Sequence, residues 1–278
     1  MVSDGTKVYS WLWGMAVLYV VLNLLVGSGI SSLLSNYGSI LITLLLFAFA
    51  LLYGATRYGW RSVLILFAIT AVLSWTMETL SIATGFPFGH YVYTDNLGPK
   101  LGTVPLLIMP AYFANGFLAW TISHILLNNL STGITRINRV QVPVIAAFVM
   151  VMWDFCIDPV TSTIDEDWVW RDGGHYFGVP ISNYFGWYQT VFLIYSGFVL
   201  YLRWNENRTT RTSPERPLPK RYWFLAPVMF FGTATLTLIH PFVLTDHSDI
   251  YWSMFLAAMM TMVFVSILAI LLISRFDE

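Results

Sequence analysis

The sequence is poor in charged residues. Only 10% of its 278 residues are Asp, Glu, Lys or Arg, whereas an average soluble domain carries roughly a quarter. So few charges cannot cover the surface of a water-soluble globule of this size, and hydrophobic residues make up 57% of the chain. With 14 Lys and Arg against 15 Asp and Glu, the net charge is −1. No basic field is therefore present to attract nucleic acid.

Several kinds of cofactor site are also missing. The single cysteine, Cys156, excludes an internal disulfide framework and any Cys-rich metal or iron–sulfur site. The chain contains no His-x-x-His-His box, no HExxH and no P-loop, which argues against a di-iron desaturase, a zinc protease and a P-loop NTPase. None of the three lysines lies in an apolar stretch, so a retinal Schiff base is excluded. We expect neither a metal nor a cofactor.

Long apolar stretches dominate the rest of the chain. A bilayer core of roughly 30 Å requires about 20 apolar residues per helix. The first stretch is too long for a signal-peptide core, so we expect it to be retained. The sequence predicts an all-α, polytopic membrane bundle that forms a single domain over 1–278, with about eight transmembrane helices at 8–28, 38–56, 62–84, 104–127, 142–160, 185–203, 222–243 and 250–273.

Basic residues indicate the orientation of these spans. With a cytoplasmic N-terminus, the outer segments hold only Lys100 and Arg171, because positive charge resists translocation. The twelve basic residues of the inner segments are Lys7, Arg57, Arg61, Arg136, Arg139, Arg203, Arg208, Arg211, Arg216, Lys220, Arg221 and Arg275. We therefore expect both termini in the cytoplasm of a multi-pass cell-membrane protein, and a flexible cytosolic linker at 204–221.

Two of the predicted outer loops differ from ordinary polar connections. Residues 85–103 and 161–184 are long, aromatic and Gly-rich. In both halves of the chain an acidic residue inside a span is followed by Gly-His-Tyr and then by Val-Pro, which is a faint internal repeat. Trp and Tyr suit membrane interfaces, so an interfacial belt alone would explain Tyr91, Tyr93, Trp168 and Trp170.

Three acidic residues lie inside predicted spans. A charge at the centre of a transmembrane helix costs about 2.5–3.5 kcal/mol on insertion scales, so such residues usually face the protein interior and mark function. Asp154 and Asp158 are four positions apart and share one helical face, although Asp158 is also close enough to the outer end to serve as a cap. Glu78 and Asp154 have similar depths in two spans that run outward. We expect both carboxyl groups to meet in one pocket in the outer leaflet, which His240 of the seventh span could join.

Four segments together resemble a known family. Downstream of Glu78 they read GFPFGHYVYTDNLGPKLGTVP, WDFCIDPV, WVW and HYFGVPISNYFGW, and they are similar to the membrane carotenoid hydratases of the bisanhydrobacterioruberin hydratase type. The resemblance covers mainly 75–110 and 150–190. It implies a lipophilic carotenoid substrate and addition of water to its terminal carbon–carbon double bond, as in the conversion of bisanhydrobacterioruberin to bacterioruberin.

Such a hydration requires a proton donor, a stabilised tertiary cation and a positioned water. A carboxylic acid in a dry pocket can remain protonated at neutral pH. We expect Asp154 to protonate the alkene, with Glu78 as the alternative donor, and the second carboxylate to act as general base towards water. Aromatic faces would stabilise the cation, and polar side chains would line a water path from the outer face. The candidates are Trp75, Trp153, Tyr91, Tyr93 and Trp187 for the cation, and Asn183, His90 and His175 for the water path.

Other function classes stay open at this point. An intramembrane prenyltransferase would use Asp154, Asp158 and the acidic run 165–167 to hold Mg²⁺ for a diphosphate. A proton-coupled transporter would use Glu78 and Asp154 as a relay. It would need polar residues that continue to the inner face, where Asn115 and His124 are modest candidates. A purely structural scaffold would leave the acids unexplained.

Overall fold

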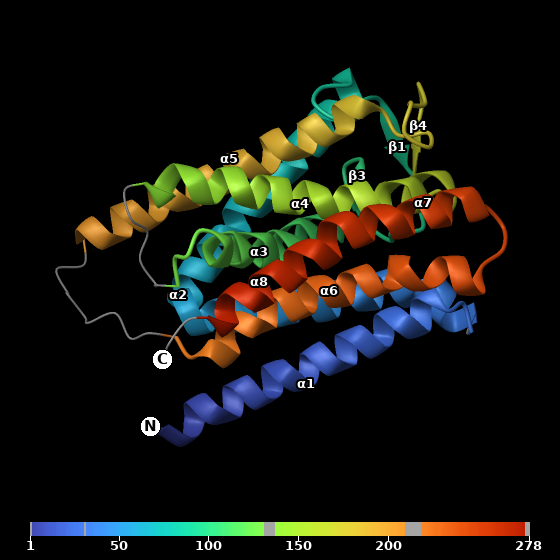
Figure 1. Cartoon of the computed structure of the whole chain (residues 1–278). Coiled ribbons are helices and arrows are strands. Elements are labelled where there is room, and N and C mark those ends of the chain that lie inside the picture. The colour runs from blue at the N-terminus through green and yellow to red at the C-terminus, as the bar shows by residue number, and fades with distance from the viewer. Residues whose placement is uncertain (1, 31, 131–136, 209–217, 276–278) are drawn as a thin grey trace.

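The computed structural model describes residues 2–30, 32–130, 137–208 and 218–275 and is a bundle of long helices (Figure 1). Half of the predicted linker at 204–221, residues 209–217, lies outside the described residues, as do the predicted cytoplasmic residues Arg136, Arg211 and Arg216. The helices are α1 Val2–Gly27, α2 Ser32–Thr84, α3 Ile108–Leu126, α4 Asn138–Thr163, α5 Ile181–Arg208, α6 Lys220–Val243, α7 Ser248–Ala258 and α8 Phe264–Ser274, with a π-helical turn, η1 Met259–Val263, between the last two.

Helix α2 is a helical hairpin. Its direction reverses at Gly59, whose φ of 75° and ψ of 158° interrupt the helical backbone. The rings of Phe47 and Phe67 lie 5.0 Å apart, although twenty residues of straight helix would separate them by about 30 Å. Figure 1 shows the returning arm of α2 running back towards the strand-bearing end of the molecule. The two arms correspond to the predicted spans 38–56 and 62–84.

Helix α3 is the central helix of the bundle. Every residue from Tyr112 to Ile125 is buried, and the helix packs against α2, α4, α6 and α8. Because its surface faces protein and not lipid, it tolerates polar residues such as Asn115, Thr121 and His124. The predicted span began at 104, but the helix begins at Ile108 because the preceding residues form a strand.

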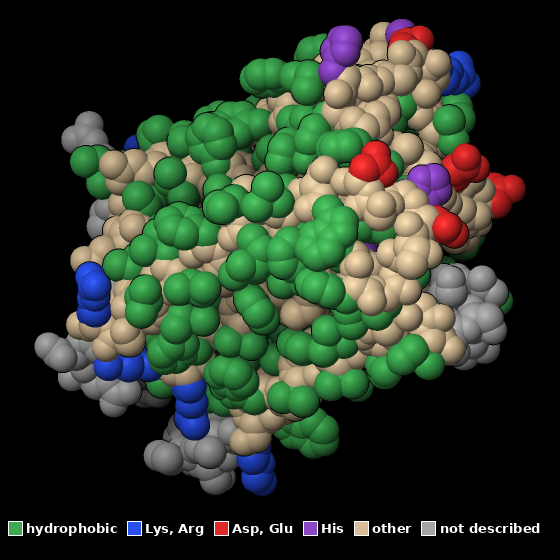
Figure 2. All heavy atoms as spheres, turned by 45° about the vertical axis from the view of Figure 1, so that its right-hand side comes forward, with side chains coloured by type: hydrophobic (Ala, Val, Ile, Leu, Met, Phe, Trp, Pro, Cys, Tyr) green, Lys and Arg blue, Asp and Glu red, His purple; other side chains and the backbone are tan. Residues whose placement is uncertain are grey.

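Six helices of the described chain are long and apolar enough to cross a membrane. They are Lys7–Gly27, Tyr37–Thr84, Asn138–Thr163, Ile181–Glu206, Lys220–Val243 and the continuous rod Ser248–Ser274. Figure 2 shows a broad hydrophobic surface, with Asp, Glu and His side chains gathered at one end and most Lys and Arg side chains at the other. The all-helical class and the membrane character agree with the sequence. The count of eight crossings and the cytoplasmic termini stay predictions.

Four short strands cover the acidic end of the bundle. β1 Tyr91–Tyr93 pairs antiparallel with β4 Trp168–Trp170, so that Tyr91 faces Trp170 and Tyr93 faces Trp168. β2 Lys100–Leu101 pairs with β3 Val104–Pro105. The two long loops predicted from sequence are thereby joined into one roof, which we call the aromatic roof (β1 and β4), over the ends of α2 and α4 (Figure 1).

Candidate functional site

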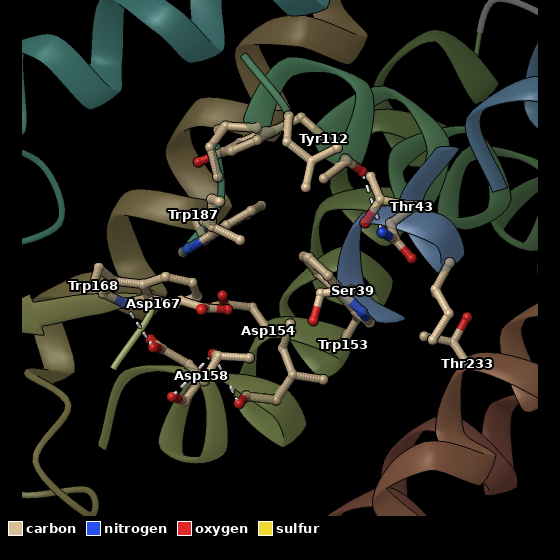
Figure 3. Close-up of a pocket in the computed structure, with 18 of the residues that line it drawn as sticks. Ser39, Thr43, Tyr112, Trp153, Asp154, Asp158, Asp167, Trp168, Trp187 and Thr233 are labelled. Atoms are coloured by element: carbon tan, nitrogen blue, oxygen red, sulfur yellow. Dashed lines mark hydrogen bonds between the residues drawn. The ribbon is translucent and has the colours of Figure 1, made fainter. Parts of the chain in front are cut away.

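A cavity of about 170 Å³ lies beneath the aromatic roof. The second arm of α2 contributes Glu78, α4 contributes Asp154 and Asp158, and α5 contributes Asn183. All four side chains are at most 3% exposed. Figure 3 shows Asp154, Asp158, Asp167, Trp168 and Trp187 around this space, which we call the acid cavity.

Three tyrosine hydroxyl groups converge on the Glu78 carboxyl group. Tyr93 donates to Oε2 at 2.8 Å and Tyr112 donates to Oε1 at 2.7 Å, and Tyr91 also donates to Oε2. Burial is the main cause, and the charge of Glu78 the second, that raises the pKa of the Tyr91 and Tyr93 phenols well above the usual value for tyrosine. The phenols therefore stay protonated as donors. An ionised carboxylate accepts hydrogen bonds on both oxygens and can accept all three.

Asp154 and Asp158 form a pair held by one amide. The Asn183 side-chain nitrogen donates to Asp154 Oδ2 at 2.9 Å and to Asp158 Oδ2 at 2.6 Å. The Trp168 indole donates to the other oxygen of Asp158 at 3.1 Å. The spacing of four residues puts both carboxyl groups on one face of α4, and this face lines the cavity. Asp158, at 1% exposure, is thus buried in the site and is not an interfacial cap.

Aromatic rings form a wall between the two acid groups. Trp187 stacks on Tyr112 with ring centroids 4.1 Å apart and an interplanar angle of 9°. Trp153 meets the same indole edge-on at 5.6 Å. The faces of these rings offer negative electrostatic potential in a buried space, which suits a carbocation.

Three of the predicted site residues do not line the acid cavity, and neither does His240, which lines a neighbouring cavity. The Trp75 indole donates to the Leu101 carbonyl at 3.1 Å and so anchors the end of β2. His90 is exposed and pairs with Asp172 at 3.0 Å on the outside of the roof. His175 is exposed as well. The other predicted residues line the acid cavity. They are Glu78, Tyr91, Tyr93, Trp153, Asp154, Asp158, Asn183 and Trp187.

Some residues that line the cavity could not be recognised from the sequence. Tyr112 is an aromatic residue within an apolar run, where a packing role is the ordinary interpretation. Trp168 and Trp170 line the cavity but fit an interfacial belt equally well by sequence. Only the pairing of β1 with β4, across more than seventy residues of chain, turns their side chains towards the acids.

The described residues do not form a cluster of metal ligands. No group of three or more His, Cys, Asp or Glu side chains in these ranges is arranged to hold a metal ion. The carboxyl groups instead have hydrogen-bond donors from Tyr, Trp and Asn. This donor set suits proton transfer between acids, water and an apolar ligand.

The fold and the cavity define a polytopic helical membrane protein with a secluded, aromatic-walled cluster of carboxyl groups. The chain belongs to a family of carotenoid biosynthesis proteins, which it matches over residues 37–274. Its role therefore lies in carotenoid biosynthesis.

One relative carries a more specific name. The chain is 32% identical over 128 residues to the bisanhydrobacterioruberin hydratase of Haloarcula japonica. The alignment covers 46% of this chain and 41% of that protein, so less than half of either chain is compared. No solved structure matches the protein.

Proposed function

We propose that the protein is a carotenoid hydratase, which adds water to the terminal carbon–carbon double bond of a long polyene and forms a tertiary alcohol. Bisanhydrobacterioruberin, or a similar carotenoid, is the proposed substrate. The observation that carries this proposal is the acid cavity itself, in which a carboxyl pair on α4 and a phenol-bound carboxyl on α2 face one aromatic-walled space. The family membership and the name of the Haloarcula relative support it.

The Asp154–Asp158 pair is the proposed proton donor. Two carboxyl groups that share a site cannot both ionise without strong repulsion, so one of them retains a proton. Asn183 donates to both acids and keeps them adjacent. Asp154 transfers its proton to the less substituted alkene carbon, a C–H bond forms, and the positive charge develops on the neighbouring tertiary carbon.

The aromatic wall and Glu78 stabilise that cation. The faces of Trp187, Trp153 and Tyr112 each contribute about 0.5–2 kcal/mol through cation–π attraction. Glu78 then takes a proton from water as the water oxygen bonds to the cation. The cycle closes when this proton returns to the Asp154–Asp158 pair, so that one water is consumed and no redox step occurs.

The cavity admits only the end of the substrate. Its volume of about 170 Å³ far exceeds the ~10–15 Å³ that one water requires, but it cannot enclose a whole carotenoid. Part of the lining is apolar and includes Leu46, Ile108 and Ala111. The reacting end would enter here while the polyene chain stays among the helices and lipid, with the site near the outer leaflet.

The deciding experiment removes each acid in a host that accumulates the unhydrated carotenoid. Asp154→Asn and Glu78→Gln keep the size of the side chain but lose its acid–base function, so we expect the tertiary alcohol to form about 10²–10⁴-fold more slowly. Asp172→Asn is the matched control, since Asp172 is 74% exposed on the roof and outside the cavity. Pigments are compared by mass for the gain of one water. Near wild-type product in both acid variants would refute the acid–base assignment.

The same membranes distinguish the magnesium-dependent prenyltransferase. Its diphosphate chemistry requires a bound divalent cation, so EDTA would abolish it. The hydratase is expected to keep its rate in EDTA, because Asp154, Asp158 and Glu78 act by proton transfer alone. A transporter would leave the carotenoid mass unchanged in every variant.

A further inference from the structure

A second, larger cavity lies beside the acid cavity at the same end of the bundle. Its volume is about 620 Å³. Asn96, Asp165 and Tyr37 at its rim are exposed, whereas Thr237 and His240 on α6 line it and are only 2% and 7% exposed. The cavity thus leads from the surface into the bundle, and we call it the vestibule.

His240 gives the vestibule a polar interior. Its ring nitrogen Nδ1 is buried and has no hydrogen-bond partner among the described residues. Buried polar groups are nearly always satisfied by protein or by ordered water. A buried water normally makes two to four hydrogen bonds, and Thr237 offers a second polar side chain on the same wall.

The vestibule and the acid cavity meet along a shared wall. Six residues line both spaces: Ser39, Leu97, Ile157, Thr161, Asp167 and Leu236. Thr161 lies one turn beyond Asp158 on α4 and Asp167 directly precedes β4, so both polar side chains stand beside the aromatic roof.

We propose that the vestibule is filled with water and supplies the reacting water to the acid cavity past Thr161 and Asp167. The supply role rests on the proposed hydratase function. The route replaces the path along His90 and His175 that the sequence suggested, since both are exposed outside the acid cavity. Hydration consumes one water per turnover, and a cavity roofed by Tyr and Trp needs a separate polar access for it.

Asp167 has properties that suit this position. It is 8% exposed. Burial, with repulsion from the neighbouring Asp165, raises its pKa to about 6. The carboxyl group can therefore exchange protons with vestibule water near neutral pH.

Cysteine labelling tests whether the vestibule is wet. Thr237→Cys and Thr235→Cys are made in a Cys156→Ala background, because Cys156 is the one native thiol. Thr235 is a close control: it lies on the same helix two positions away and is buried, but does not line either cavity. Open membrane fragments are treated with a cationic methanethiosulfonate, because the acidic rim does not repel a positive charge. Only a hydrated thiol ionises and reacts readily. We therefore expect the thiol at position 237 to be modified at least about tenfold faster than the thiol at position 235.

The activity of the labelled protein tests the supply role. Modified Thr237→Cys should lose most hydration of the carotenoid, whereas Thr235→Cys treated in the same way should keep it. Equal labelling at the two positions, or full activity of the modified Thr237→Cys protein, would overturn the proposal. Thr161→Cys, at the shared wall, gives the same test if Thr237→Cys fails to accumulate. If the untreated wild-type chain forms no alcohol, the proposed function fails, and the labelling ratio still decides whether the vestibule holds water.

Discussion

At the residue level, the environment of Glu78 differs from that of the Asp154–Asp158 pair. Glu78 accepts from three phenols, and hydrogen bonds to a charged group contribute about 1.5–3 kcal/mol each. The two aspartates share one Asn183 amide. Three phenol donors stabilise a charged carboxylate at Glu78, whereas two adjacent carboxyl groups share a proton more readily. This difference underlies the proposed roles of Glu78 as base and of the Asp154–Asp158 pair as acid.

Tyr112→Phe tests this division of roles. The substitution removes one donor from Glu78 Oε1 but leaves the stack on Trp187 in place. A loss of about 1.5–3 kcal/mol of charge stabilisation disfavours the ionised base, so we expect the ionised fraction, and with it the hydration rate, to fall roughly tenfold to hundredfold. The rate is measured per folded protein, with carotenoid binding followed separately by absorbance.

Tyr195→Phe provides the matched control. Tyr195 is also buried, but its hydroxyl donates to the Gly116 carbonyl at 3.0 Å and it does not line the acid cavity. We expect its rate to stay close to wild type. Equal rate losses in both variants would mean that Tyr112 contributes only to packing.

The sequence identified the acids more readily than their partners. Glu78, Asp154 and Asp158 stand out because charge inside an apolar run is costly. The prediction that His90 lines the water path did not take account of strand β1. Side chains alternate in direction along a strand, so when Tyr91 and Tyr93 of β1 point into the cavity, His90 points to the opposite side. That alternation becomes visible only once the strand is known.

At the element level, one glycine determines how α2 folds. The sequence separated two apolar runs at 56–62, and the structure reverses within that interval at Gly59. The three-residue strands of the roof could not be predicted in the same way. Each is too short to show a period, and β1 pairs with a partner that lies far along the chain.

Gly59→Ala is expected to destabilise the protein by about 1–3 kcal/mol. The φ of 75° and ψ of 158° lie in a region that is essentially restricted to glycine. A Cβ at this position would meet nothing within 4 Å, so backbone strain is the sole cause. Thermal unfolding in detergent, followed by helical circular dichroism, measures the loss.

Gly14→Ala separates this strain from a general effect of added methyl groups. Gly14 lies within α1 and its Cβ would also meet nothing within 4 Å. Alanine is favoured over glycine in a helix by roughly 0.5–1 kcal/mol, so this variant should be unchanged or slightly more stable. An unfolding temperature for Gly59→Ala that equals or exceeds that of Gly14→Ala would contradict the strained turn.

At the scale of the whole molecule, charge is divided between the two ends of the bundle. Figure 2 shows acidic and histidine side chains at one end and most basic side chains at the other, across a hydrophobic surface. Helix α1 begins and α8 ends at the end opposite the aromatic roof (Figure 1). Lys7, Arg203 and Arg275 lie towards the ends of their helices and belong to the predicted inner segments of the sequence.

This polarity predicts the topology of the chain in the membrane. Because basic segments stay in the cytoplasm, both termini are expected inside and the roof-forming segments 85–103 and 161–184 outside. Alkaline phosphatase inserted at Gly173, in the bend after β4, should be active, since it folds only beyond the membrane. The same enzyme fused after Glu278 should be inactive, whereas a fluorescent protein there should fluoresce.

Phosphatase activity at the C-terminus would imply an odd number of crossings if the N-terminus is inside. An inactive insertion at Gly173, with the protein otherwise folded, would move the acid cavity and its vestibule to the cytoplasmic side, so that the reacting water would come from the cytosol.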